Sequence, residues 1–167
     1  MIIRPATATD LADLTHVINE IIALGGSTAH QRPFDQKRMQ DHYVAPPSGI
    51  SCQVAEDNGR VIGFQSLLWP RNDSDPLPAG WATIASFVAS QAAGKGVGQK
   101  LFAATRQAAA AAGVTTIDAT IRADNVAGLR YYTGLGFADY DRLVAIPLRD
   151  GTVVDRIRKR FDLSMSA

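Results

Sequence analysis

The stretch Phe87–Leu101, FVASQAAGKGVGQKL, decides the fold predicted for this chain. A short apolar run ends there, three glycines follow at alternate positions (Gly94, Gly96 and Gly98), and an alanine-rich helical segment begins. Glycine has no Cβ, so its backbone can turn tightly and approach a ligand closely. A helix that starts directly after such a turn presents unpaired N–H groups and the positive end of its dipole. The stretch therefore predicts a strand, a phosphate-binding turn and a helix.

Two well-known glycine motifs do not fit this turn. A dinucleotide-binding fingerprint needs a third glycine at position 99 or 101, where this chain has Gln99 and Leu101. A nucleoside-triphosphate loop needs Gly-Lys followed by Ser or Thr, whereas Lys95 is followed by Gly96. On the glycines alone, a turn that only connects a strand to a helix is the remaining alternative.

The rest of the chain predicts one mixed α/β domain that covers residues 1–167. The predicted element order is β-α-α-β-β-β-α-β-α-β-β, with parallel pairing only around the connecting helices. A hairpin turn is expected at Asn58-Gly59, and Gly25-Gly26 should end the first helix. The expected strands cover residues 1–4, 50–56, 60–69, 81–89, 114–121, 137–147 and 152–163, and the expected helices begin at Thr9, Asp35, Gly98 and Asn125.

Composition narrows the class of protein. Apolar residues make up 46% and charged residues 20%, which is typical of a globular domain with a packed core. The net charge of +1 gives no general argument for binding nucleic acid or a membrane surface. Cys52 is the only cysteine, so an internal disulfide is impossible and a reducing compartment is favoured. With neither a signal-peptide pattern nor a long apolar run, we expect a cytoplasmic protein without nucleic-acid or membrane partners.

A second motif, IDATIRADNVAGLRYYTGLGF, occupies residues 117–137. On its predicted helix, Asn125, Leu129 and Tyr132 have i, i+4, i+7 spacing and share one face. An Asn and a Tyr on a face that packs against a sheet need polar partners. One interpretation is a ligand site, and the alternative is a helix-capping Asn beside a buried structural Tyr.

The two motifs, in this order, resemble those of the GCN5-related N-acetyltransferase (GNAT) family. AGKGVGQKL at residues 93–101 is similar to the family's acetyl-coenzyme A turn, and NVAGLRYYTGLGF at 125–137 to its next signature. The resemblance covers nearly the whole chain, and the loop GGSTAHQRPF resembles the phosphinothricin acetyltransferase-like branch. It implies a single GNAT domain with a mixed sheet of about six to seven strands and about four helices. It also implies direct acetyl transfer from acetyl-coenzyme A, without a metal, to a small amino-acid-like amine.

The resemblance implies roles for individual residues. Backbone N–H groups between Ala93 and Gly98 would hold the coenzyme pyrophosphate, and Tyr132 would protonate the departing thiolate. The family usually has Arg or Gln where this chain has Ala93, so coenzyme binding should be modestly weaker. Lys95 and Lys100 would supply charge for the phosphates, and the alternative is that both are solvated surface lysines. The implied coenzyme-binding residues are Phe87, Val88, Ala93, Gly94, Lys95, Gly96, Val97, Gly98 and Asn125.

The proton acceptor is less clearly specified. The family often has a glutamate on the fourth strand, but this chain has Thr83 and Ala85 there and only two glutamates in total. Glu20, near the end of the first predicted helix, is the first candidate for a catalytic base. The alternatives are His30 or Asp73, on loops that could border the same pocket, and deprotonation through water.

The acceptor is expected to be a small-molecule amine, and Arg32, Arg71 or Arg122 could pair with its carboxylate. A protein acceptor is less attractive, because the sequence indicates no acidic groove. The alternative function is a non-catalytic acyl-coenzyme A sensor or regulatory module. A third interpretation is a structural subunit that acts through its C-terminal hairpin, and its alternative is a solvated or homodimer-edge strand. It rests on three arginines that would line one exposed face of the last strand: Arg156, Arg158 and Arg160.

Overall fold

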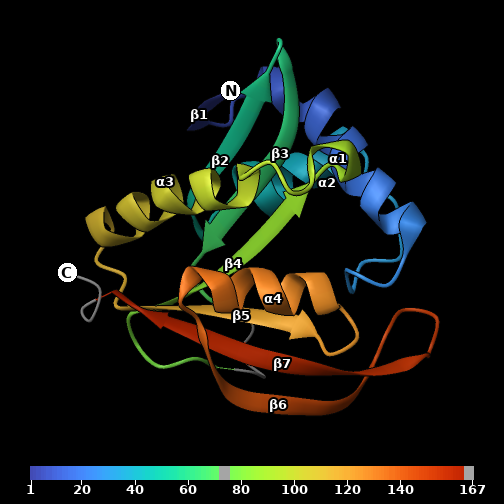
Figure 1. The fold of residues 1–167 in the computed structure, drawn as a ribbon, viewed down its shortest axis with the longest axis vertical. Coiled ribbons are helices and arrows are strands. Elements are labelled where there is room, and N and C mark those ends of the chain that lie inside the picture. Colours follow the sequence, from blue (N-terminus) through green and yellow to red (C-terminus); the bar gives the residue numbers. More distant parts are fainter. Residues whose placement is uncertain (72–75, 164–167) are drawn as a thin grey trace.

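The computed structural model describes residues 1–71 and 76–163, in which seven strands form one mixed sheet with helices on both faces (Figure 1). The strand order is β1-β2-β3-β4-β5-β7-β6, and β4 and β5 are parallel whereas the other neighbours are antiparallel. The predicted fold class is confirmed. The strands are β1 (Ile2–Pro5), β2 (Gly49–Asp57), β3 (Arg60–Leu68), β4 (Trp81–Val88), β5 (Thr116–Arg122), β6 (Ala138–Pro147) and β7 (Val153–Asp162).

The helices begin and end close to the predicted positions. The Asp35 carboxylate accepts a hydrogen bond from the Arg38 N–H at 2.7 Å and caps the second predicted helix. That helix has one α-helical turn and then widens into a π-helix, in which the Ala45 N–H donates to the Gln40 carbonyl. The helical segments are η1 (Ala8–Asp10), α1 (Leu11–Leu24), α2 (Gln36–Met39), η2 (Gln40–Val44), η3 (Ser90–Ala92), α3 (Val97–Ala111) and α4 (Val126–Leu135).

Helices cover the two faces of the sheet with separate apolar clusters. Leu14 of α1 and Met39 of α2 pack with Phe87 of β4. Phe102 of α3 packs with Ile84 of β4 and with α4 in another cluster. Because side chains alternate along a strand, Phe87 and Ile84 point to opposite faces. The helices α1 and α2 therefore cover one face, and α3 and α4 cover the other.

The sheet opens at its centre. The parallel ladder between β4 and β5 pairs only Trp81–Thr83 with Thr116–Asp118, while β4 stays paired with β3 up to Val88. Figure 1 shows the arrows of β4 and β5 pointing apart beyond that ladder. The outer part of β4 therefore has one edge without a neighbouring strand, and its residues Phe87 and Val88 line a cleft, so backbone groups there are available to a ligand.

The arginines of β7 correct one prediction. They do not line an exposed face, because Arg158 is 5% exposed and its Nε lies 3.3 Å from the Asp118 carboxylate. Arg156 is half-buried, and Arg160 is exposed. The physical reason is the buried Asp118 on neighbouring β5, whose charge needs a partner.

None of the helices in the described residues combines the length and apolar character that a membrane crossing needs.

Candidate active site

The glycine turn lies at the mouth of the cleft. Gly94 and Gly96 have φ values of 78° and 77°, which L-residues with a side chain rarely adopt, and Gly96 caps α3. A Cβ on Gly94 would meet nothing within 4 Å, so the conformation of the turn requires glycine there and packing does not. A Cβ on Gly98 would lie 2.5 Å from Cε1 of Tyr131. Gly98 therefore allows α3 and α4 to approach each other closely.

A cavity of about 740 Å³ adjoins this turn. It is bordered by the turn, by the cleft edge of β4 and by the first turns of α4. Of the predicted coenzyme-binding residues, the exposed Lys95 is not among the described lining residues, and Gln99 lines the cavity without having been predicted. The predicted residues that the structure brings together here are Phe87, Val88, Ala93, Gly94, Gly96, Val97, Gly98 and Asn125.

A second cavity of about 240 Å³ continues the cleft toward β5 and β7. Tyr132 and His30 line this cavity and not the first. The residues that line both cavities are Ser27, Ser86, Phe87, Asn125, Gly128 and Tyr131. Two spaces with different walls thus meet at the end of β4.

Tyr132 is buried in the wall of the second cavity, and its phenol oxygen lies 2.8 Å from the Oγ of Ser86, which lines both cavities. Gln65 donates through Nε2 to Ser86 Oγ at 2.8 Å and to the Tyr131 hydroxyl at 3.0 Å. Tyr131 in turn donates to the Gly98 carbonyl at 2.7 Å. Burial raises the pKa of Tyr132 well above its usual value and that of Tyr131 to about 12. Both phenols therefore keep their protons at neutral pH.

Asn125 caps α4. Its Oδ1 accepts the Gly128 N–H at 3.0 Å, and its Nδ2 donates to the Ser27 carbonyl at 3.0 Å. A Cβ on Gly128 would lie 2.4 Å from that Nδ2, so Gly128 makes room for the cap. Asn125 thus has the structural role that was the alternative interpretation, while it also lines both cavities.

Glu20 lies beside the glycine turn. Its Oε1 accepts hydrogen bonds from the Ser90 N–H at 3.1 Å and from the Ser90 hydroxyl at 2.8 Å. These donors hold the pKa of the Glu20 carboxyl below its usual value. Glu20 is not among the described residues that line either cavity, so its carboxylate fixes η3 at the start of the turn.

His30 lines the second cavity, and its Nε2 lies 2.6 Å from the Tyr43 hydroxyl. Burial, together with the charges of His42 and Arg38, lowers the pKa of His30 to about 4. The imidazole is therefore neutral at pH 7. The other loop candidate, Asp73, lies outside the described residues.

The three arginines predicted to bind a carboxylate have different surroundings. Arg122 lines the second cavity but already pairs with Asp124 at 2.8 Å. Arg71 donates to the main-chain carbonyl of His42. Arg32 lies in a separate pocket, which shares none of its lining residues with the second cavity.

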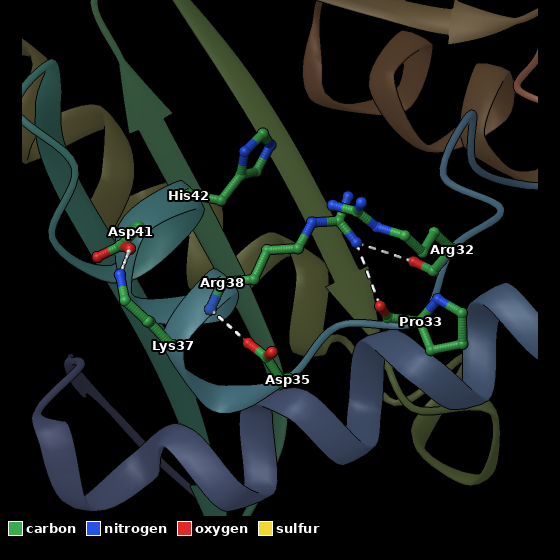
Figure 2. A pocket seen from close by; sticks show the side chains of 7 residues that line it. All are labelled: Arg32, Pro33, Asp35, Lys37, Arg38, Asp41 and His42. Carbon is green, nitrogen blue, oxygen red and sulfur yellow. Dashed lines mark hydrogen bonds and ion pairs between the residues drawn. The ribbon is translucent and has the colours of Figure 1, made fainter.

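The pocket around Arg32 has a mixed charge. Figure 2 shows Arg38 donating to the carbonyls of Arg32 and Pro33, at 3.0 and 3.2 Å, and Asp41 paired with Lys37. Asp35, Lys37, Arg38 and Asp41 therefore already have partners within the chain. The residues that line it are Arg32, Pro33, Asp35, Lys37, Arg38, Asp41 and His42.

Arg156 lines the second cavity and was not predicted to do so. The alternation with Arg158 and Arg160 indicated one strand face, but nothing in the sequence indicated the cleft that this face meets.

Within the described residues, no group of three or more His, Cys, Asp or Glu side chains could hold a metal ion.

Comparisons with protein families and with solved structures both identify acetyltransferases as similar to this chain. The model of the acetyltransferase (GNAT) family matches residues 16–137. No curated protein matches the chain in sequence. Similar solved structures include a phosphinothricin acetyltransferase from Sinorhizobium meliloti in complex with acetyl-coenzyme A (22% identity, 96% of this chain, 87% of that chain, TM-score 0.80). A ribosomal-protein-alanine N-acetyltransferase from Brucella melitensis is 24% identical over 97% of this chain and 99% of that chain, with a TM-score of 0.80.

Proposed function

Because this chain belongs to the acetyltransferase (GNAT) family, we propose that it transfers an acetyl group from acetyl-coenzyme A directly to the amine of a small amino-acid-like molecule. The observation that carries the proposal is the position of Tyr132. Its buried, protonated phenol lines the smaller cavity and lies 2.8 Å from the Oγ of Ser86, which lines both that cavity and the one beside the glycine turn. A cytoplasmic location and a homodimer stay predictions.

The larger cavity fits the coenzyme by its donor groups. Backbone N–H groups of residues 94–98, at the start of α3, would bind the pyrophosphate, because they lie at the positive end of a helix and the Ala93 N–H already donates to the Ser90 carbonyl at 3.2 Å. The cleft edge of β4 near Phe87 and Val88 would pair with the amide groups of the pantetheine arm. Lys95, exposed on the turn, would act through its charge alone.

The smaller cavity would hold the acceptor. The neutral amine attacks the thioester carbonyl carbon, so a C–N bond forms and an oxyanion develops. An N–H group near Val88 stabilises that oxyanion. The C–S bond then breaks, and Tyr132 donates its proton to the departing thiolate. Solvent returns a proton to the Tyr132 phenolate through Ser86, whose hydroxyl lies 2.8 Å away.

The proton lost by the amine must go to a base or to water. The geometry favours His30 over Glu20, because His30 lines the cavity of Tyr132 and Glu20 is not among the described residues that line either cavity. Glu20 accepts hydrogen bonds from Ser90 on the coenzyme side.

We expect His30→Gln to lower kcat about tenfold with little change in KM for acetyl-coenzyme A, and Glu20→Gln to change kcat far less. Initial rates at pH 7 measure both, and the reverse order of effects would return Glu20 to the role of base.

The main test is thiol release from acetyl-coenzyme A with a panel of amino acids and polyamines. Tyr132→Phe should lower kcat by about 100-fold and leave the coenzyme Kd unchanged, because only the proton donor is lost. Tyr140→Phe is the matched control, since that phenol donates to the Asp118 carboxylate and Tyr140 is not among the described residues that line either cavity. Equal rates for Tyr132→Phe and the wild-type protein would remove Tyr132 from the mechanism.

A non-catalytic acyl-coenzyme A sensor is the second candidate. It is favoured by one observation: no Asp or Glu is among the described residues that line the cavity of Tyr132. Calorimetric binding of acetyl-coenzyme A without acetylation of any amine in the panel would select the sensor.

A further inference from the structure

Arg156 of β7 is a half-buried cation with an unused donor. Its Nε is buried and has no hydrogen-bond partner, and its side chain has no ion pair within residues 1–71 and 76–163. Taking a guanidinium out of water is unfavourable unless its donors are matched by an anion or by acceptors. Arg156 is therefore poised for a partner that is not part of the described chain.

Arg156 lies in the wall of the cavity proposed to hold the acceptor. It lines the cavity of about 240 Å³ that also contains Tyr132, and it lines an adjoining cavity of about 430 Å³. The two cavities share Tyr43, Ile84, Ala85 and Arg156 as walls. A small molecule bound at this boundary can place one end on Arg156 and the other toward Tyr132.

The surrounding charges are positive or already neutralised. Arg122 pairs with Asp124, and Arg158 pairs with Asp118. Burial, and then the charges of Arg122 and Arg158, lower the pKa of Arg156. No Asp or Glu is among the described residues that line either cavity, so these walls leave the charge of Arg156 uncompensated.

We propose that Arg156 is a specificity-determining residue that binds an anionic oxygen group of the acceptor, so that the acceptor is an amino acid or similar zwitterion instead of a plain amine. This inference rests on the proposed acetyl transfer for its identification of the acceptor. A guanidinium matches a carboxylate with two parallel hydrogen bonds, and it binds a phosphonate or phosphinate through the same donors. The chemistry needed is one anionic group a short distance from the reacting amine.

The test compares L-amino acids with their α-amides, which lack the negative charge. The wild-type protein should acetylate the acid with kcat/KM at least about tenfold above that of the amide. Arg156→Met should raise KM for the acid about tenfold or more and remove this preference, with a much smaller change in KM for the amide. Arg156→Lys should restore part of the preference for the acid over the amide. Aminoalkylphosphonates in a parallel series separate a phosphonate preference from a carboxylate preference.

Two further measurements separate the site from a structural role. Arg160→Met, on the same strand face but exposed, should leave the preference unchanged. The Tm of Arg156→Met should equal or exceed that of the wild-type protein, because an uncompensated buried charge is removed. A large fall in Tm would indicate a structural cation and would overturn the proposal.

The remaining outcomes distinguish this proposal from the proposed activity. Acetylation of acids and amides at equal rates would overturn the Arg156 site and leave acetyl transfer standing. If no amine is acetylated, calorimetry tests whether the protein binds N-acetyl amino acids in the presence of coenzyme A, and this binding decides whether the Arg156 site exists. Binding that Arg156→Met abolishes supports the site although the activity has failed, and absence of binding overturns the site as well.

Discussion

The coenzyme side of the cleft offers mainly backbone groups, whereas the acceptor side is lined by side chains. On the coenzyme side, residues 93–98 and the edge of β4 offer backbone groups, and the cavity adjoins the start of α3. On the acceptor side, the walls are side chains from separate elements, including His30, Tyr43 and Arg156. A site made of main chain depends on local conformation, whereas a site made of side chains depends on the packing of distant segments.

The largest expected effect tests the close packing behind the coenzyme side. Gly98→Ala places a Cβ 2.5 Å from the ring of Tyr131, so the ring or α3 must shift. We expect the free energy of unfolding to fall by about 1–3 kcal/mol and coenzyme binding to weaken with it. Urea unfolding and calorimetry measure the two effects.

Gly134→Ala is the matched control for that change. A Cβ on Gly134, in α4, meets nothing within 4 Å, so alanine should stabilise the protein by about 0.5–1 kcal/mol through helix propensity. Equal effects at the two glycines would contradict the importance of close packing between α3 and α4.

The acceptor side should also respond to pH, because the half-buried His30 lines its cavity and the half-buried His42 lies beside His30, with ring centroids 5.4 Å apart. The pKa values of His30 and His42 are lowered to about 4 from an ordinary value of 6.5. Between these values the unfolded state binds protons that the folded state does not, so stability is complete above pH 6.5 and falls as the pH falls toward 4. Urea unfolding across this range measures the slope.

His30→Asn should reduce that slope, because one of the two groups is removed. His16→Asn, at an exposed position on α1, is the control and should leave the slope nearly unchanged. An identical slope in the His30 variant would show that the imidazole is not held neutral by the fold.

The smallest expected effect concerns the unusual Ala93. Ala93→Arg adds a cation beside the backbone donors, and we expect coenzyme affinity to rise about threefold at low ionic strength. The gain should shrink in 1 M salt, since an exposed charge is screened. Calorimetric titration at two salt concentrations measures it, and a loss of affinity would mean that the turn needs a small residue at this position.

The contrast between the two sides also explains what could be predicted from the sequence. Gly94 and Gly96 have the left-handed conformation for which glycine is the usual residue, and the hairpin at Asn58-Gly59 has positive φ at both residues. These features depend on a few neighbouring residues. The cap at Asn125 is equally local, which is why helix capping was a correct alternative for it.

Long-range placement was not predictable in the same way. Glu20 and Ser90 meet across 70 residues, and the burial of Arg158 depends on Asp118, which is 40 residues away. The insertion of β7 between β5 and β6 brings Arg156 to the cleft. A pattern of alternating arginines identifies one strand face, but only the packed sheet determines what that face meets.

The most direct test of the account is a backbone amide NMR titration of the protein with acetyl-coenzyme A. The account predicts saturable shifts of the Gly94, Gly96 and Gly98 amides and of Phe87 and Val88, with much smaller shifts at Arg32 and Arg38 in the separate pocket. Saturable binding that shifts the separate pocket and leaves the glycine turn unmoved would contradict it.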